Sequence, residues 1–294
     1  MNDGKSVVQS QTSRLALTST NPGRIANLAV RAQLEASGQP LITGFVIEGN
    51  GTRPVLMRSV GETLRGFGLS AAVANPALQL YRGSALIGEN DDWATDVTAS
   101  ETLAVSGLVG AFPLASAAKD AAMVRRLVAG NYSIQTQNLT SAGGEVLVEL
   151  YAAAGRDSGD SRIANVSTRA KIVAEDGALI AGLTIEGNTT LRLLARVVGP
   201  GLTSFGVTDA LADPTLALYA AGASVPLATN DDWGSVQATV VGESLFRRVG
   251  AFDLKPGSRD AVIVTRLPPG SYTLVAQGKG ADAGQALIEI YLID

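Results

Sequence analysis

The chain has 294 residues, of which 46% are hydrophobic and 17% are charged, a composition typical of a folded chain with sizeable cores. It contains no cysteine and no histidine, which excludes disulfides, thiolate or imidazole zinc sites, thiol nucleophiles and imidazole bases. The net charge of −4 argues against nucleic acid as a partner, because nucleic-acid binding rests on clustered lysine and arginine.

The first 23 residues precede the rest of the pattern. Met1–Ser13 is polar and lacks the apolar core of a signal peptide, so we expect no signal peptide within this chain. An alternating pattern typical of a strand follows, and it begins at Arg14, Leu15, Ala16 and Leu17. One interpretation is an edge strand that adds to its own domain or to a neighbouring molecule. The alternative is a terminus without fixed structure.

The remaining sequence is a tandem duplication. Asn90-Asp91-Asp92-Trp93 returns 140 residues later, from 90 to 230, as Asn230-Asp231-Asp232-Trp233. Two earlier motifs return 138 residues later, so the second copy has two extra residues after Tyr219. These motifs are Arg24-Ile25-Ala26-Asn27, which returns as Arg162-Ile163-Ala164-Asn165, and Ile47-Glu48-Gly49-Asn50, which returns as Ile185-Glu186-Gly187-Asn188.

The duplication predicts four segments. They are an N-terminal tail (1–23), a first repeat (24–153), a short polar linker (154–161) and a second repeat (162–294). Repeats of this size suit independent domains better than the short units of a solenoid.

Within each repeat the pattern predicts strands. Leu28, Val30, Ala32 and Leu34 share one parity and indicate a half-buried strand. The Glu-Gly-Asn motifs at 48–50 and 186–188 are typical of hairpin turns, and residues 97–109 are compatible with a short helix. About eight short strands a repeat, with turns between them, predict an all-β protein of two tandem antiparallel β-sandwich domains of jelly-roll type. No run is long and uninterrupted enough to span a membrane as a helix.

The second half of each repeat resembles the bacterial pre-peptidase C-terminal domains and related sandwich modules of secreted proteins. The matching segments of the first copy are 78–81 (LQLY), 86–92 (LIGENDD), 128–134 (VAGNYSI) and 148–151 (VELY). Their counterparts are 216–219 (LALY), 227–232 (LATNDD), 267–274 (LPPGSYTL) and 288–291 (IEIY). The resemblance implies a non-catalytic extracellular module, sometimes calcium-binding, that serves as a spacer or for attachment.

The Asn-Asp-Asp-Trp motifs are candidate calcium sites, because calcium prefers hard oxygen ligands. The candidate ligands are Asn90, Asp91, Asp92, Asn230, Asp231 and Asp232, and Asp120 or Asp260 would approach from another loop. The alternative is that these side chains cap a turn by bonding their own backbone, while Trp93 and Trp233 close one end of the core.

Two glutamates lie between apolar neighbours within strands, at Glu149 and Glu289. With Glu48 or Glu186 as a second acid, each would form a catalytic carboxylate pair. The favoured interpretation is instead one partly buried Arg–Glu pair in each repeat, since no other reactive group accompanies these acids.

Most aromatic residues recur at matched positions, as Phe67 does with Phe205, and matched aromatics indicate core rather than a sugar-binding platform. We therefore expect no enzyme, but an extracellular or cell-surface structural protein for adhesion, without a cofactor other than calcium. Addition of the tail strand would join molecules into filaments. The alternative is a module of a secreted protein that binds carbohydrate, such as a surface glycan, or calcium.

Overall fold

The structure is a computed structural model that describes residues 21–35, 39–154, 158–173, 177–234, 243–280 and 282–293. The strands of the first repeat are β1 (Arg24–Leu34), β2 (Leu41–Glu48), β3 (Arg53–Val60), β4 (Pro76–Arg82), β5 (Ala85–Asn90), β6 (Ala121–Leu127), β7 (Gly130–Asn138) and β8 (Gly144–Ala152). Those of the second are β9 (Arg162–Ile172), β10 (Leu179–Glu186), β11 (Leu191–Val198), β12 (Pro214–Ala220), β13 (Ala228–Asn230), β14 (Ala261–Leu267), β15 (Gly270–Gly278) and β16 (Gly284–Ile293).

Short helices lie in the loops of both repeats. They are η1 (Glu62–Phe67), η2 (Trp93–Thr95) and α1 (Ala99–Leu108) in the first repeat, and η3 (Pro200–Phe205) and α2 (Glu243–Arg248) in the second. α1 confirms the short helix expected around 97–109. Within the described part of the chain, no helix combines the length and apolar character needed to cross a membrane.

Each repeat is an eight-stranded jelly roll. In the first, β1, β8, β3 and β6 lie side by side in one sheet, and β2, β7, β4 and β5 in the other. The second repeat has the same order, with β9, β16, β11 and β14 in one sheet and β10, β15, β12 and β13 in the other. The predicted all-β class and the antiparallel jelly-roll sandwich are thereby confirmed.

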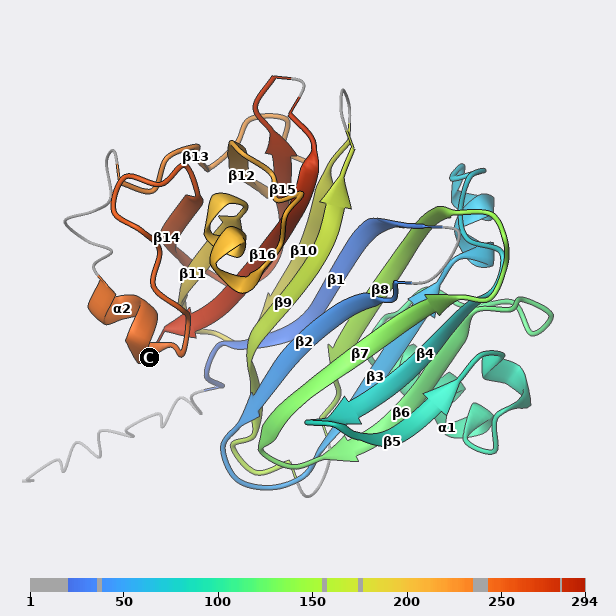
Figure 1. Ribbon diagram of the computed structural model, residues 1–294. Coiled ribbons are helices and arrows are strands. Elements are labelled where there is room, and N and C mark those ends of the chain that lie inside the picture. The colour runs from blue at the N-terminus through green and yellow to red at the C-terminus, as the bar shows by residue number, and fades with distance from the viewer. Residues whose placement is uncertain are drawn as a thin grey trace, which may run out of the picture.

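The two jelly rolls are joined edge to edge. β1 of the first repeat pairs with β10 of the second, and β2 pairs with β9, both in antiparallel fashion. Two continuous eight-stranded sheets result, which we call the β1 sheet and the β2 sheet after these strands. Figure 1 shows the four joining strands in the middle of the molecule, between the outer strands of the two repeats.

The two junctions are related by the duplication. Arg24 of β1 lies opposite Glu186 of β10, and Arg162 of β9 lies opposite Glu48 of β2. One residue is skipped in the ladder at the same place in both, at Ala26 and Ala164, which marks matched β-bulges. The first strand of each repeat therefore meets the second strand of the other repeat in the same register, as in a symmetric dimer.

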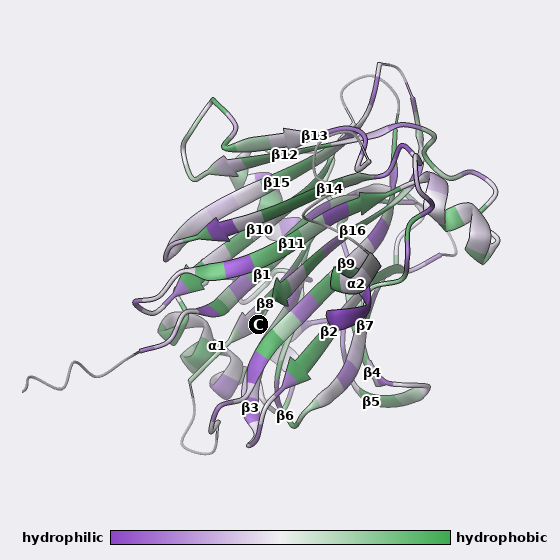
Figure 2. Cartoon of the chain, turned by 90° about the vertical axis from the view of Figure 1, so that its left-hand side faces the viewer, coloured by the Kyte–Doolittle hydropathy of each residue, from purple (hydrophilic) through white to green (hydrophobic). Residues whose placement is uncertain are grey.

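One hydrophobic core runs through both repeats. Leu28 and Phe45 from the first repeat, and Val166 and Leu183 from the second, belong to one cluster of buried residues. Figure 2 shows the hydrophobic residues (green) on the strands of both repeats. The expectation of independent domains is therefore corrected. Alternation along a strand shows which face is buried, but it does not show which strand lies alongside, so the shared edges were not predicted.

The Glu-Gly-Asn turns also differ from expectation. β2 and β3 belong to different sheets, so the turn at 48–50 connects the two layers and does not close a hairpin. Gly49 has a φ of +85°, and a Cβ there would lie 2.6 Å from the Asp160 carbonyl oxygen. Gly187 has a φ of +103°, and its Cβ would lie 2.5 Å from the Pro22 carbonyl oxygen. Each glycine thus allows a close approach between its repeat and the segment leading into the other repeat.

Loops cover part of the outer face of each sheet. On the β2 sheet, a second cluster of buried residues joins α2 and the following loop to β11, β14 and β16; it includes Trp233, Phe246 and Leu254. On the β1 sheet, two smaller clusters cover β3, β6 and β8 and include Leu64 and Val105. These coverings stop short of the joining strands, whose outer faces carry half-exposed side chains.

Candidate functional site

A trough crosses the outer face of the β2 sheet over the strands that join the repeats. Its floor is formed by alternate residues of β9 (Asn165, Ser167, Arg169) and of β2 (Ile42, Gly44, Val46, Glu48). Two adjoining pockets, of about 580 and 380 Å³, share these strands. From Asn165 to Arg169 the floor is about 13 Å long, at the usual rise of a strand. We call this depression the β9 trough.

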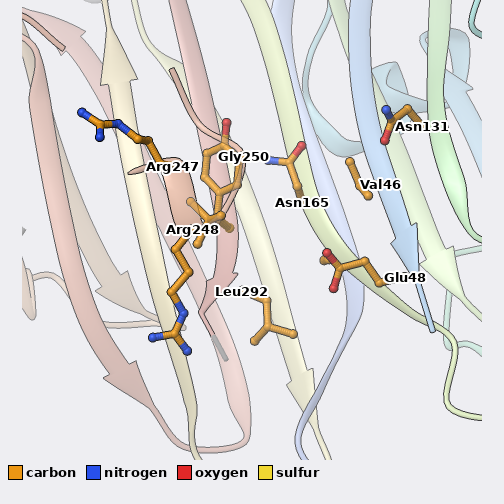
Figure 3. Close-up of a pocket in the computed structure, with 11 residues that line it drawn as sticks. Val46, Glu48, Asn131, Asn165, Arg247, Arg248, Gly250 and Leu292 are labelled. Atoms are coloured by element: carbon orange, nitrogen blue, oxygen red, sulfur yellow. The ribbon is translucent and has the colours of Figure 1, made fainter. Parts of the chain in front are cut away.

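The wall of the β9 trough comes from the second repeat, from its covering loops and from β16. At one end it consists of residues 247–250 with Tyr291 and Leu292, and at the other of Leu202, Phe205, Val207 and Phe252. Figure 3 shows Arg247 and Arg248 on one side of the first pocket and Val46, Glu48 and Asn131 on the other. Residues of both repeats are therefore needed to build one trough.

The β1 sheet carries an equivalent trough. A pocket of about 380 Å³ is lined there by Ala26, Asn27, Val109, Gly110, Tyr151 and Glu186. Each is the copy of a residue in the first pocket of the β9 trough: Ala164, Asn165, Val249, Gly250, Tyr291 and Glu48. We call this the β1 trough. We include in its floor Ala29 and Arg31 of β1, which lie opposite Gly182 and Ile180 of β10, because their copies Ser167, Arg169, Gly44 and Ile42 line the β9 trough. Residues of the repeated Arg-Ile-Ala-Asn and Ile-Glu-Gly-Asn motifs thus line two related sites.

Phe205 lines the β9 trough, and its copy in the first repeat is Phe67. The exposed fraction of Phe67 is 64% and that of Phe205 is 63%. Each packs edge-on against a more buried ring, Phe67 on Phe112 at 5.1 Å between ring centres and Phe205 on Phe252 at 4.9 Å. The expectation that Phe67 and Phe205 are core residues is therefore wrong. Their positions in η1 and η3 leave one ring face open to solvent.

The predicted Arg–Glu pairs are confirmed, and they lie beneath these walls. Arg58 Nε donates a hydrogen bond of 2.8 Å to Glu149 Oε2, and Arg58 Nη1 donates one of 2.7 Å to the Phe112 carbonyl oxygen. The Arg58 guanidinium also lies 4.1 Å from the centre of the Phe112 ring. The buried cation therefore holds the loop at Phe112 against the sheet.

The second repeat has the same arrangement. Arg196 donates 2.8 Å and 2.7 Å hydrogen bonds to Glu289 Oε2 and to the Phe252 carbonyl oxygen, and its guanidinium lies 4.6 Å from the Phe252 ring centre. The hydroxyls of Tyr151 and Tyr291 donate to the other carboxylate oxygens of Glu149 and Glu289.

Glu149 and Glu289 are each bonded to an arginine and a tyrosine, and not to Glu48 or Glu186. Burial and the neighbouring carboxylates raise the pKa of Tyr151 and of Tyr291 above the usual value, and burial also raises the pKa of Glu149. Glu48 and Glu186 are instead exposed and form ion pairs across the junctions, with Arg162 at 3.5 Å and Arg24 at 2.7 Å. One carboxylate lines the main pocket of each trough.

The Asn-Asp-Asp-Trp motifs lie away from both troughs, and their asparagines hold the loop to the sheet. Asn90 Oδ1 accepts a 2.8 Å hydrogen bond from the Ala122 N–H, and Asn230 Oδ1 accepts one of 2.7 Å from the Val262 N–H. Asp231 forms an ion pair with Lys279 at 2.8 Å, which lowers the pKa of that carboxyl. Asn90 Nδ2 and Asn230 Nδ2 also donate hydrogen bonds to the carbonyl oxygens of Asp92 and Asp232, at 3.4 and 3.1 Å, as the turn-capping alternative expects.

The two aspartates expected to approach the motif from another loop, Asp120 and Asp260, have other partners. Asp120 accepts hydrogen bonds from the N–H groups of Gly61 and Thr63, and Asp260 accepts them from Gly199 and Gly201. Both are therefore turned towards a different loop from the motif. The described residues contain no cluster of three or more acidic side chains placed to hold a metal. Calcium binding by the six candidate residues, Asn90, Asp91, Asp92, Asn230, Asp231 and Asp232, stays a prediction.

Trp93 and Trp233 are both buried and donate hydrogen bonds, of 3.0 Å to the Ala115 carbonyl and 3.1 Å to the Lys255 carbonyl. Trp233 packs in the cluster on the outer face of the β2 sheet, so it does not close the end of the main core. The residues predicted to form an added strand, 14–17, lie outside the described part of the chain. Self-association through them stays a prediction.

No protein-family model matches the chain, and no curated protein matches it by sequence. The tandem CBM51 modules of a family 98 glycoside hydrolase from Streptococcus pneumoniae are 7% identical over 90% of this chain and 84% of theirs, with a TM-score of 0.26. A DUF4785 family protein from Legionella pneumophila is 9% identical over 99% of this chain and 90% of its own, with a TM-score of 0.23. Similarities at this level identify neither a family nor a function.

Proposed function

We propose that this chain is a non-catalytic adhesive protein of the cell exterior that holds carbohydrate in its two troughs. The observation that carries the proposal is the matched exposure of Phe67 and Phe205, of which Phe205 lines a pocket whose floor includes Ser167 and Arg169. An aromatic ring packs well against the apolar face of a sugar. Asparagine amides, guanidinium groups and carboxylates supply the paired donors and acceptors that sugar hydroxyls require.

The shape of the β9 trough supports an extended ligand. Its floor follows two strands for about 13 Å and includes Gly44, whose missing side chain keeps the middle of the floor low. Gly182 occupies the equivalent place in the β1 trough. Glycine within a strand often marks a place where a ligand approaches the backbone closely.

The acids support binding without turnover. Hydrolysis of a glycosidic bond generally requires two carboxyl groups that flank the bond. The main pocket of each trough is lined by one carboxylate, Glu48 or Glu186, and that carboxylate faces an arginine of the other repeat.

The proposal is tested by glycan-array binding of the wild type and of Phe67→Ser/Phe205→Ser. We expect the wild type to bind a defined set of glycans and the double variant to lose most of that binding. Val225→Ser is the matched control, because Val225 is an equally exposed apolar residue (73%) that lines none of the pockets described above. Retained binding in the double variant, or no glycan bound by the wild type, would contradict the proposal.

A further inference from the structure

The two troughs have diverged in charge. In the β1 trough, Arg31 forms an ion pair with Glu145 at 3.6 Å. The copy of Glu145 is Gln285, which lines a pocket together with Arg169, the copy of Arg31. Arg169 is exposed and has no ion-pair partner among the described residues. The acid closest in that pocket, Glu35, pairs with Lys171 at 3.5 Å. The β9 trough therefore keeps a cation that is neutralised in the β1 trough.

A second difference between the repeats also adds positive charge, at the other end of the β9 trough. Leu108 lines the pocket of the β1 trough, and its copy Arg248 lines the β9 trough. Arg248 is exposed, and Figure 3 places its guanidinium on the α2 side, across the pocket from Glu48. The neighbouring Arg247 replaces Gly107, but Asp253 lies 3.4 Å from it and offsets its charge.

We infer that the β9 trough binds an acidic glycan, whereas the β1 trough binds a neutral one; this inference rests on the proposed function. The guanidinium groups of Arg169 and Arg248 stand near opposite ends of the β9 trough. Guanidinium binds carboxylate and sulfate oxygens through paired, charge-assisted hydrogen bonds. Two separated cations along one trough fit a chain that carries repeated negative charges.

The duplication supplies the variants that test this inference. Arg248→Leu/Gln285→Glu gives the β9 trough the residues of the β1 trough, and Leu108→Arg/Glu145→Gln makes the reciprocal change. Leu108 and Arg248 are exposed, Glu145 and Gln285 are half-buried, and none of the four belongs to a cluster of buried core residues. The probes are an array of uronate-bearing, sialylated and sulfated glycans beside their neutral parents, followed by calorimetric titration of the strongest acidic probe.

We expect the wild type to bind one equivalent of the acidic probe, more weakly as salt is raised. Arg248→Leu/Gln285→Glu should weaken that binding about tenfold or more, as expected when charge-assisted hydrogen bonds are lost, and should leave the binding of neutral glycans unchanged. Leu108→Arg/Glu145→Gln should raise the stoichiometry of the acidic probe towards two.

The outcomes distinguish failure of the inference from failure of the proposed function. If the wild type binds neutral glycans alone, or if Arg248→Leu/Gln285→Glu binds the acidic probe as tightly as the wild type, the inference is wrong and the proposed function stands. If the wild type binds no glycan of either kind, the proposed function fails and the inference fails with it.

Discussion

At the scale of single residues, the most consequential groups are Arg58 and Arg196, the two largest fully buried side chains among those described. A buried cation is tolerated only when it is paired and hydrogen-bonded, and each of these has a glutamate and a backbone carbonyl as partners. The carbonyl belongs to Phe112 or Phe252, against which the exposed phenylalanine of the trough packs. A single buried pair in each repeat thus supports both the fold and the trough wall.

The tyrosines of these clusters predict how stability depends on pH. The pKa of Tyr151 and of Tyr291 is raised in the folded protein, whereas an exposed tyrosine titrates near pH 10. Below pH 10 both states keep the phenolic proton. Above it, the unfolded state loses the proton first, so the free energy of unfolding falls as the pH rises towards the folded-state pKa.

The measurement is guanidinium denaturation at several values between about pH 8 and 11.5. We expect Tyr151→Phe/Tyr291→Phe to be less stable at pH 8 and to lose less stability as the pH rises than the wild type does. Tyr81→Phe serves as the control, since the half-buried Tyr81 bonds the neutral amide of Gln79 and not a carboxylate. Equal slopes for wild type and double variant would contradict the account of these clusters.

At the scale of elements, the joining strands determine the architecture. β1 and β2 would be edge strands of an isolated jelly roll, with unpaired backbone groups that invite association. In this chain each is covered by a strand of the other repeat, so the duplication itself satisfies those edges. The trough floors then form on the outer faces of the same strands.

The turn glycines test whether the close approach at the junction matters. Gly222→Ala should cost about 1 kcal/mol, because Gly222 has a φ of +74° but no atom near its missing Cβ. Gly187→Ala should cost clearly more, about 2 to 3 kcal/mol, since it combines a φ of +103° with a contact of 2.5 Å to the Pro22 carbonyl oxygen.

Thermal or chemical denaturation of the two variants provides the comparison. Gly182→Ala is a further control, because the nearest atom to a Cβ there, in Ala29, is 3.7 Å away. If Gly187→Ala costs no more than Gly222→Ala, the turn does not hold the two repeats together.

Much of the strand structure could be predicted from the sequence. The alternation at Leu28, Val30, Ala32 and Leu34 identified the buried face of β1, and all four are buried. The pairing of β1 with β10 could not be predicted, because period-two alternation is the same for an edge strand and a central one. The signal was present in the repeated Arg-Ile-Ala-Asn and Ile-Glu-Gly-Asn motifs, whose arginines and glutamates meet across the junctions.

The candidate site was harder to predict. The recurrence of Phe67 as Phe205 is equally compatible with a core residue and with a ligand contact. Only the exposed position of both rings in the structure distinguishes the two interpretations. The trough floors depend on residues from both repeats, so they become visible only once the edges are paired. The acidic motifs, in contrast, stood out in sequence but lie in loops away from the troughs.

At the scale of the whole molecule, the central claim is that the two repeats form one body with one core. The troughs depend on this union, since each combines the wall of one repeat with a floor strand from the other. Four side chains that are buried in the intact chain would lie at open sheet edges if the repeats were separate. They are Leu28, Phe45, Val166 and Leu183. We therefore expect fusion of the repeats to be a condition for stability and for the proposed binding.

The most direct test is cleavage of the linker. A protease recognition sequence placed between Ala154 and Ser158 allows the chain to be cut without removing a residue of either sheet. The account predicts that the cut halves co-elute in size-exclusion chromatography with the mass of the intact chain, and separate only in denaturant. Halves that separate under native conditions, each folded and with half the mass, would contradict it.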